Sequence, residues 1–233
     1  MIKLATLFLL LLETCNLLGN NINKEYTLWY NRPAFNRGGD FNYPVARGYP
    51  YDEDWERWSL PIGNGSMGAC IFGRTDIERI QLSEKTLGNK GPYQLGGFTN
   101  FAEIYIDVNH NYSKNYKRTL NLNEAISTVN YQHENVEYTR EYFANYPSQI
   151  IAVKLKADKS GMISFTLRPT IPYLKPFDKE QNGRSGHVQV LPGLITITGN
   201  IQYYDLDYEA QIKIVNYKLL GKTNGEILLL VLN

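Results

Sequence analysis

The chain has 233 residues, of which 24 are basic and 23 acidic, so its net charge is only +1. This balance offers no electrostatic footprint for nucleic acid or for an anionic membrane surface, and neither is expected as a partner. The 18 tyrosines, 9 phenylalanines and 3 tryptophans suit β-strands, and an all-β sandwich of this length is commonly one domain.

The N-terminus predicts a secretory signal peptide over residues 1–20. A short basic start, Met1-Ile2-Lys3, precedes an apolar run from Leu4 to Leu12 that is too short to span a membrane as a helix. We therefore expect an exported protein, periplasmic or extracellular, with no membrane span. Lipid anchoring at Cys15 is an alternative, although the residues before it suit a lipoprotein signal poorly. With so few cysteines no disulfide framework is expected, and the apolar neighbours of Cys70 predict a buried, inert thiol.

A first strand is expected near Leu28, and a loop from Arg37 to Asp54 leads from it to the next strand. The acidic cluster Asp52–Glu56 lies among aromatic residues at the end of this loop. Trp55 and Trp58 are candidates for stacking on sugar rings, because an aromatic face suits a sugar. A solvated loop without a ligand is the alternative.

A glycine-rich block begins at Leu60. Its Gly63-x-Gly65-x-x-Gly68 string satisfies the dinucleotide-binding pattern, which carries mechanism only when a strand enters it and a helix leaves it. Here residues 69–73 are followed by the turn signal Arg74-Thr75-Asp76 and by an alternating run from Ile77 to Leu82, which predicts a β-hairpin. We therefore predict that the three glycines are structural and allow close backbone approach or positive φ.

From residue 102 onward, apolar and polar residues alternate with a period of two, as in strands with one wet and one dry face. No stretch after the signal shows a helical apolar period. The sequence thus predicts an all-β, large antiparallel β-sandwich with no helical catalytic domain and no helix longer than about three turns. The alternating runs are Ile104–Val108, Ile151–Lys156, Ile163–Arg168, Leu194–Thr198 and Tyr208–Ile214.

An ordered series of short motifs also extends along the chain. It comprises Leu28–Ala34, Leu60–Gly65, Met67–Ala69, Ile71–Gly73, Glu78–Leu82, Glu84–Leu87, Glu103–Asp107, Tyr116–Leu122 and Val136–Ala144. This series resembles the N-terminal domain of glycoside hydrolase family 95, the inverting α-L-fucosidases and related α-L-galactosidases. The resemblance implies one β-sandwich domain over residues 25–233, truncated at its C-terminal end.

In the resembled family, a glutamate acid and an asparagine and aspartate that activate water lie on an (α/α)6 barrel that follows the sandwich. This sequence contains no such barrel, so the resemblance implies a supporting domain of an exported fucosidase-like enzyme, inactive alone and without catalytic residues. Fucosylated glycans would be bound through the missing catalytic domain. The final apolar run, Ile227–Leu232, is expected to lie exposed where that barrel would pack. A free-standing carbohydrate-binding or interaction module is the alternative function.

Asn64, Glu84 and Thr86 are the candidate barrel-facing or substrate-facing residues, because the resemblance is densest around them. The structural alternative is that Asn64 stabilises its own turn and Glu84 caps a loop. The acids of Asp205-x-Asp207-x-Glu209 are expected on the wet side of a strand. The three histidines show no metal-ligand spacing, so neither a metal nor a cofactor is expected.

Overall fold

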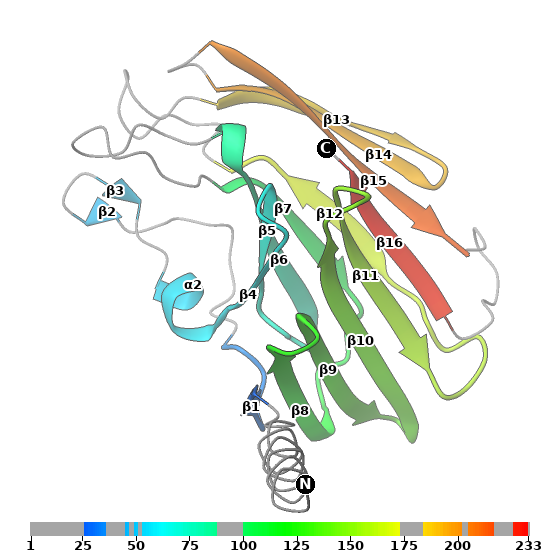
Figure 1. The fold of residues 1–233 in the computed structure, drawn as a ribbon. Coiled ribbons are helices and arrows are strands. Elements are labelled where there is room, and N and C mark those ends of the chain that lie inside the picture. The colour runs from blue at the N-terminus through cyan, green and yellow to red at the C-terminus, as the bar shows by residue number, and fades with distance from the viewer. Residues whose placement is uncertain are drawn as a thin grey trace, which may run out of the picture.

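Two large antiparallel sheets packed face to face make up the fold, as Figure 1 shows, so the all-β sandwich predicted from the sequence is confirmed. The computed structural model describes residues 26–35, 45–46, 49–50, 53–87, 100–172, 184–201, 205–216 and 226–232. The predicted signal peptide, residues 1–20 with Cys15, lies outside the described residues.

The larger sheet has nine strands in the order β1-β8-β9-β10-β11-β16-β15-β14-β13. Most neighbours in this order are also neighbours along the chain, and the exceptions are β1 beside β8 and β11 beside β16. The strands are β1 (Thr27–Tyr30), β8 (Lys114–Asn121), β9 (Ile126–His133), β10 (Val136–Asn145), β11 (Ile150–Ala157), β13 (Arg184–Leu191), β14 (Leu194–Ile201), β15 (Leu206–Val215) and β16 (Glu226–Leu232).

The smaller sheet has five strands in the order β12-β7-β6-β5-β4, and its β4 and β5 face β9, β10 and β11 across the core. Its strands are β4 (Leu60–Gly63), β5 (Met67–Ile71), β6 (Ile77–Glu84), β7 (Asn100–Asp107) and β12 (Thr166–Thr170). A two-stranded ladder, a short helix and one 3-10 turn complete the described elements. They are β2 (Val45–Ala46), β3 (Tyr49–Pro50), α2 (Glu53–Trp58) and η1 (Lys85–Leu87).

The core lies between the two sheets and follows the period-two pattern. In β14, Ile195, Ile197 and Ile201 are buried, while Thr196 and Thr198 on the other face are partly exposed. Burying each large aliphatic side chain of this kind stabilises the fold by about 1.5–3 kcal/mol relative to leaving it exposed. The alternation therefore determines which face of β14 packs inward.

The glycine block forms a tight hairpin between β4 and β5, in which Gly63 pairs with Gly68. Gly65 in the turn has a φ of +88°, a conformation that L side chains rarely adopt. A Cβ on Gly68 would lie 3.0 Å from Ser83 Oγ on the next strand. β5 then pairs directly with β6, so the predicted hairpin is confirmed and no helix follows the glycines. This excludes the strand-to-helix context that dinucleotide binding requires.

Two local expectations were wrong. The segment that carries Trp55 and Trp58 is the helix α2 rather than a loop, and its C-terminal end is held by Ser59, whose Oγ donates to the Trp55 carbonyl oxygen at 2.7 Å. The strand expected from Ile163 begins later, at Thr166. Both elements are short, so contacts with neighbouring elements decide their limits more than periodicity does.

The final apolar run forms β16, which pairs with β11 on one side and β15 on the other. Its Val231 is only 1% exposed, so the expected exposure was wrong for this residue. The run therefore belongs to the interior of this sheet.

Candidate functional site

Asn64 lies in the turn between β4 and β5 and ties this turn to the opposite sheet. Its Oδ1 accepts hydrogen bonds from the backbone N–H groups of Ser66 at 3.0 Å and Met67 at 2.8 Å. Its Nδ2 donates to the carbonyl oxygen of Asn145, at the end of β10, 3.0 Å away. The two bonds within the turn agree with the structural alternative, in which Asn64 stabilises its own turn.

Glu84 ends β6 and is buried at 3% exposure, whereas Thr86 in η1 is exposed. Glu84 Oε2 accepts a hydrogen bond from the Thr86 N–H at 2.6 Å and another from the Thr86 hydroxyl, so the carboxylate caps η1. The backbone N–H of Lys85 donates to the Ser66 carbonyl oxygen at 2.9 Å. The structure therefore brings the Glu84 cap and the Asn64 turn together at one end of the smaller sheet.

Trp55 and Trp58 lie on α2 but differ in what they present to solvent. Trp55 is 47% exposed, and its Nε1 donates to Cys70 Sγ at 3.0 Å. Cys70 itself is half-buried, whereas the sequence predicted a buried thiol. The Trp58 ring lies under the Arg32 guanidinium, 5.1 Å from its centroid, and its carbonyl oxygen accepts from Arg118 Nη1 at 2.6 Å. Trp55 is thus the more accessible of the two candidate stacking platforms.

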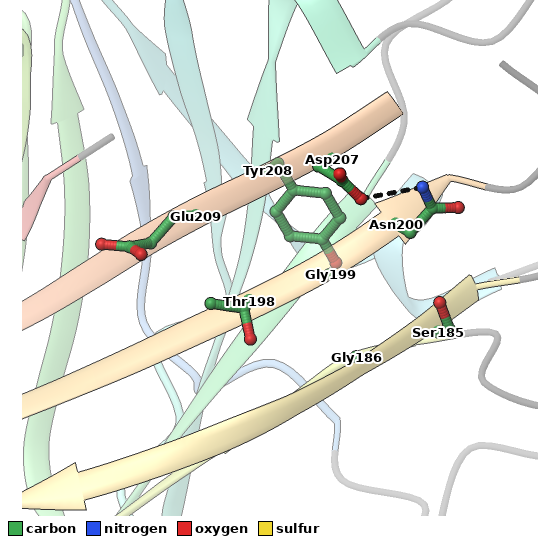
Figure 2. Close-up of a pocket in the computed structure, with 8 residues that line it drawn as sticks. All are labelled: Ser185, Gly186, Thr198, Gly199, Asn200, Asp207, Tyr208 and Glu209. Carbon is green, nitrogen blue, oxygen red and sulfur yellow. Dashed lines mark hydrogen bonds between the residues drawn. The ribbon is translucent and has the colours of Figure 1, made fainter. Parts of the chain in front are cut away.

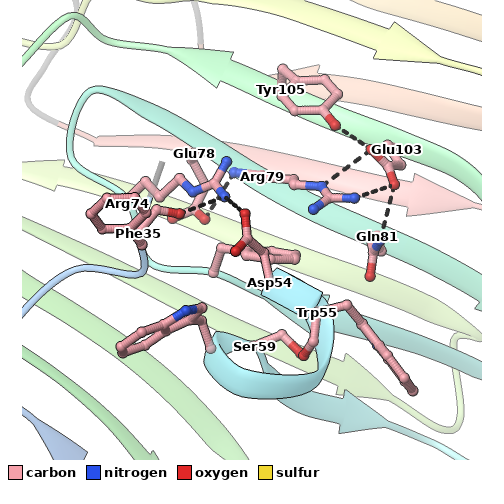
Figure 3. Close-up of polar contacts among 12 residues, drawn as sticks. Phe35, Asp54, Trp55, Ser59, Arg74, Glu78, Arg79, Gln81, Glu103 and Tyr105 are labelled. Carbon is pink, nitrogen blue, oxygen red and sulfur yellow. Dashed lines mark hydrogen bonds and ion pairs between the residues drawn. The ribbon is translucent and has the colours of Figure 1, made fainter. Parts of the chain in front are cut away.

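The face of β6 and β7 that is turned away from the larger sheet carries a buried polar cluster, shown in Figure 3. Arg79 donates to both carboxylate oxygens of Glu103, from Nη2 at 2.9 Å and from Nε at 3.3 Å. Gln81 donates to the same carboxylate at 3.0 Å, Asn100 at 2.6 Å, and the Tyr105 hydroxyl also donates to it. Glu103 is 0% and Arg79 1% exposed, so the expectation that the polar face of β7 is solvated was wrong at Glu103. The buried charges are tolerated because each has an opposite charge and further hydrogen bonds.

These contacts determine the protonation states in the cluster. Burial alone would raise the pKa of Glu103, but the Arg79 charge and the hydrogen bonds from Arg79, Tyr105 and Gln81 outweigh it and lower that pKa. Burial and the nearby Glu103 charge raise the pKa of Tyr105 above its ordinary value. Glu103 is therefore ionised at neutral pH. A carboxylic acid that protonates a glycosidic oxygen needs the opposite, a raised pKa.

A second buried ion pair joins the two sheets. Arg140 Nη1 on β10 lies 3.1 Å from Glu78 Oε2 on β6, and the Tyr142 hydroxyl donates to the same oxygen at 2.7 Å. Sequence reasoning missed both ion pairs. The available signal was the adjacent pair Glu78-Arg79 within an apolar strand, because neighbouring side chains point to opposite faces and each then needs its own partner.

Strands β13, β14 and β15 carry an open polar groove of about 530 Å³, shown in Figure 2. Cross-strand neighbours supply its hydroxyl, amide and carboxylate groups, and Asn200 Nδ2 donates to Asp207 Oδ1 at 2.9 Å. Asp207 and Glu209 are exposed, as expected for alternating acids on the wet side of a strand. The polar lining residues are Ser185, Thr198, Asn200, Asp207 and Glu209.

The candidates predicted from the sequence do not converge on one site. Asn64, Glu84 and Thr86 gather at the end of β4, β5 and β6, Trp55 lies on α2, and the groove lies on β13–β15 of the other sheet. Within the described residues, no group of three or more His, Cys, Asp or Glu side chains is placed to hold a metal ion. No helix in the described part of the chain is long and apolar enough to cross a membrane.

Comparison with known proteins identifies the domain. The family described as "Glycosyl hydrolase family 65, N-terminal domain" matches residues 28–95 and 87–225. The "Alpha-L-fucosidase 2" of Arabidopsis thaliana is 29% identical over 176 residues, which cover 58% of this chain and 21% of that protein. The "Probable alpha-fucosidase A" of Aspergillus oryzae (strain ATCC 42149 / RIB 40) is 22% identical over 138 residues, which cover 41% of this chain and 19% of that protein. The chain thus spans about a fifth of the length of these curated relatives.

A solved structure described as a putative kojibiose phosphorylase from human microbiome aligns with a TM-score of 0.42 at 12% identity, over 74% of this chain and 28% of that chain. The fucosidase names of the two curated relatives confirm the resemblance to the N-terminal domain of an α-L-fucosidase-like glycoside hydrolase. Because the family match extends from residue 28 to residue 225, the chain belongs to the glycosyl hydrolase family 65 N-terminal domain family.

Proposed function

We propose that this chain is the N-terminal supporting domain of an exported α-L-fucosidase-like glycoside hydrolase of family 95, acting on terminal α-linked L-fucose or L-galactose of glycans. The observation that carries the proposal is the match to a glycosidase N-terminal domain together with the fucosidase names of two relatives. Catalysis is assigned to a separate catalytic domain.

The pairing of the buried carboxylates favours a supporting rather than a catalytic role for this domain. Glu103 is held by Arg79 and Glu78 by Arg140, so both carboxylates are committed to the fold. The lowered pKa of Glu103 makes it a poor proton donor at neutral pH. Glycoside hydrolysis requires a protonated acid on one side of the scissile bond and a base on the other.

Within this proposal, Asn64, Glu84 and Thr86 are the residues that face the catalytic domain or its substrate. Two observations favour this assignment: the three residues lie together at one end of the smaller sheet, and Thr86 is exposed. Trp55 and Trp58 are proposed as the sugar-stacking residues, and the half-exposed ring of Trp55 makes it the stronger candidate.

The test uses three proteins and a fucosyl-α-1,2-galactoside as the substrate. The chain alone is expected to release no L-fucose. A hybrid in which this chain replaces the matching N-terminal segment of the Arabidopsis relative is expected to release it, and the relative without that segment serves as the matched control. Fucose release by the chain alone, lost in Glu84→Gln, would contradict the proposal and place catalysis in the sandwich.

The alternative function is a free-standing carbohydrate-binding or interaction module, and the polar groove of β13–β15 favours it. Its carboxylate, amide and hydroxyl groups can hydrogen-bond a polyhydroxylated ligand. Glycan-array binding by the chain alone distinguishes the two functions. Binding that is lost in Asp207→Ala but retained in Lys154→Ala, a change on β11, would favour the module.

A further inference from the structure

The connection between β7 and β8, residues 108–113, is held against the hairpin of β9 and β10 by two stacked histidines. The rings of His110 and His133 lie 4.3 Å apart between centroids and 18° from parallel. His110 also packs on the Tyr138 ring at 4.4 Å. Two backbone N–H groups at the start of the connection donate to the Asp76 carbonyl oxygen. The connection is therefore anchored at its start, and its middle is held by the imidazoles.

Hydrogen-bond direction determines the protonation state of His110. Arg140 can only donate, so the Tyr131 hydroxyl oxygen accepts its Nη2–H at 2.8 Å. The Tyr131 proton is then donated to His110 Nδ1, 2.8 Å away, which makes His110 neutral with its hydrogen on Nε2. His133 Nδ1 faces the carbonyl oxygen of Tyr112 at 2.8 Å and must donate to it.

The environment of His110 disfavours a positive charge. The titratable groups that face it are Tyr131 and His133 of β9, and Tyr138 and Arg140 of β10. Burial, followed by the charges of His133 and Arg140, lowers the pKa of His110 to about 4. The nearby carboxylates do not compensate, because Glu134 is 79% exposed and Glu78 is already paired with Arg140.

We propose that the His110–His133 stack is an acid-sensitive latch, in which a proton on His110 releases the 108–113 connection from the β9–β10 hairpin. The proton must bind Nδ1, because Nε2 already carries a hydrogen. It breaks the hydrogen bond from Tyr131 and places a cation beside Arg140. Opening relieves this conflict, so proton uptake from solvent and release of the connection occur together.

The direction of the pH effect follows from the two states. The ordinary pKa of 6.5 applies to the open form and a pKa of about 4 to the closed form. The open form therefore binds more protons between these values. The latch is fully stabilising above pH 6.5 and is lost as pH falls towards 4, with the opening equilibrium rising about tenfold per pH unit.

The experiment measures hydrogen–deuterium exchange of the amides of residues 108–113 in the full chain between pH 7 and 5, corrected for intrinsic exchange rates. Protection is expected to fall about tenfold per pH unit between pH 6 and 5. His110→Asn keeps an acceptor for Tyr131 but cannot be protonated, so its protection is expected to stay flat. His187→Asn, on the distant strand β13, is the matched control and should retain the wild-type pH dependence.

Wild-type protection that does not change between pH 6.5 and 5 would overturn the proposal. So would a His110→Asn chain that follows the wild-type slope. If His110→Asn does not fold, nuclear magnetic resonance titration of the three histidines in the wild-type chain decides. One ring that titrates below pH 5 supports the latch, and three rings that titrate near 6.5 overturn it.

Discussion

At the scale of single residues, this domain uses ionised side chains where a sandwich ordinarily has apolar ones. Glu78 and Arg140 span the gap between the sheets, and two tyrosines and backbone groups of residues 73, 74 and 79 supply further hydrogen bonds. Such a pair gains little over well-packed apolar residues, because desolvation offsets the attraction between the charges. Removing one partner is different, since it leaves the other charge buried alone.

Arg140→Met is therefore expected to lower the free energy of unfolding by about 3–5 kcal/mol, measured by urea denaturation. Lys154→Met is the control, because Lys154 and Glu141 form a partly exposed pair 3.9 Å apart, and its loss should cost less than about 1 kcal/mol. A cost below about 1 kcal/mol for Arg140→Met would contradict the expectation that the substitution leaves Glu78 buried without its counter-charge.

At the scale of elements, turns and strand ends depend on a few constrained positions. Gly65 is such a position, because its φ of +88° is one that L side chains rarely adopt, although a side chain there would meet nothing within 4 Å. Its cost to other residues is thus one of backbone conformation and not of space.

Gly65→Val is expected to destabilise the domain by about 1–3 kcal/mol, because a β-branched residue is strained at this φ. Gly65→Asn should cost less, since asparagine tolerates positive φ. Thermal unfolding of the two variants checks the order. An unchanged melting temperature in Gly65→Val would mean that the turn adopts another conformation.

The period of two predicted most strands, because it reports how side chains alternate between faces, and with the turn signal at Arg74–Asp76 it predicted the β5–β6 hairpin. The same periodicity could not predict that Glu103 is buried. Its burial depends on the ion pair with Arg79, which lies on the neighbouring strand β6 and reaches Glu103 only when β6 and β7 pair. The periodicity also could not predict α2, whose six residues are fewer than two turns. For the candidate site, the roles of Asn64 in its own turn and of Glu84 as a cap were predicted as structural alternatives, but the bond from Asn64 to Asn145 on the opposite sheet was not, because it depends on how the sheets pack.

At the scale of the whole molecule, the larger sheet depends on its interior strand β16, which joins β11 to β15. Val231 is 1% exposed there, whereas Val190 on the edge strand β13 is 68% exposed. The same substitution at these two valines changes the side chain identically, so any difference in stability between the two variants reports the difference in burial.

Val231→Asp is expected to cost about 3–5 kcal/mol or to prevent folding, because it buries a charge without a partner. Val190→Asp should change stability by no more than about 0.5 kcal/mol, as is usual for surface positions. Urea denaturation or the soluble yield checks both. Equal effects of the two substitutions would mean that β16 is not an interior strand in the folded protein.

The position of β16 also determines when the domain can fold during synthesis. Ile150 on β11 pairs with Leu232, so one edge of β11 has no partner until residues 226–232 have been made. Until then, β11 ends one partial sheet and β15 ends another, and both edges expose unpaired backbone groups that can pair with other chains. Pairing between such distant segments is also slow. During synthesis the domain therefore stays open to misassembly until residues 226–232 have been made, and its yield in a cell depends on how well chaperones cover these two edges until β16 is inserted.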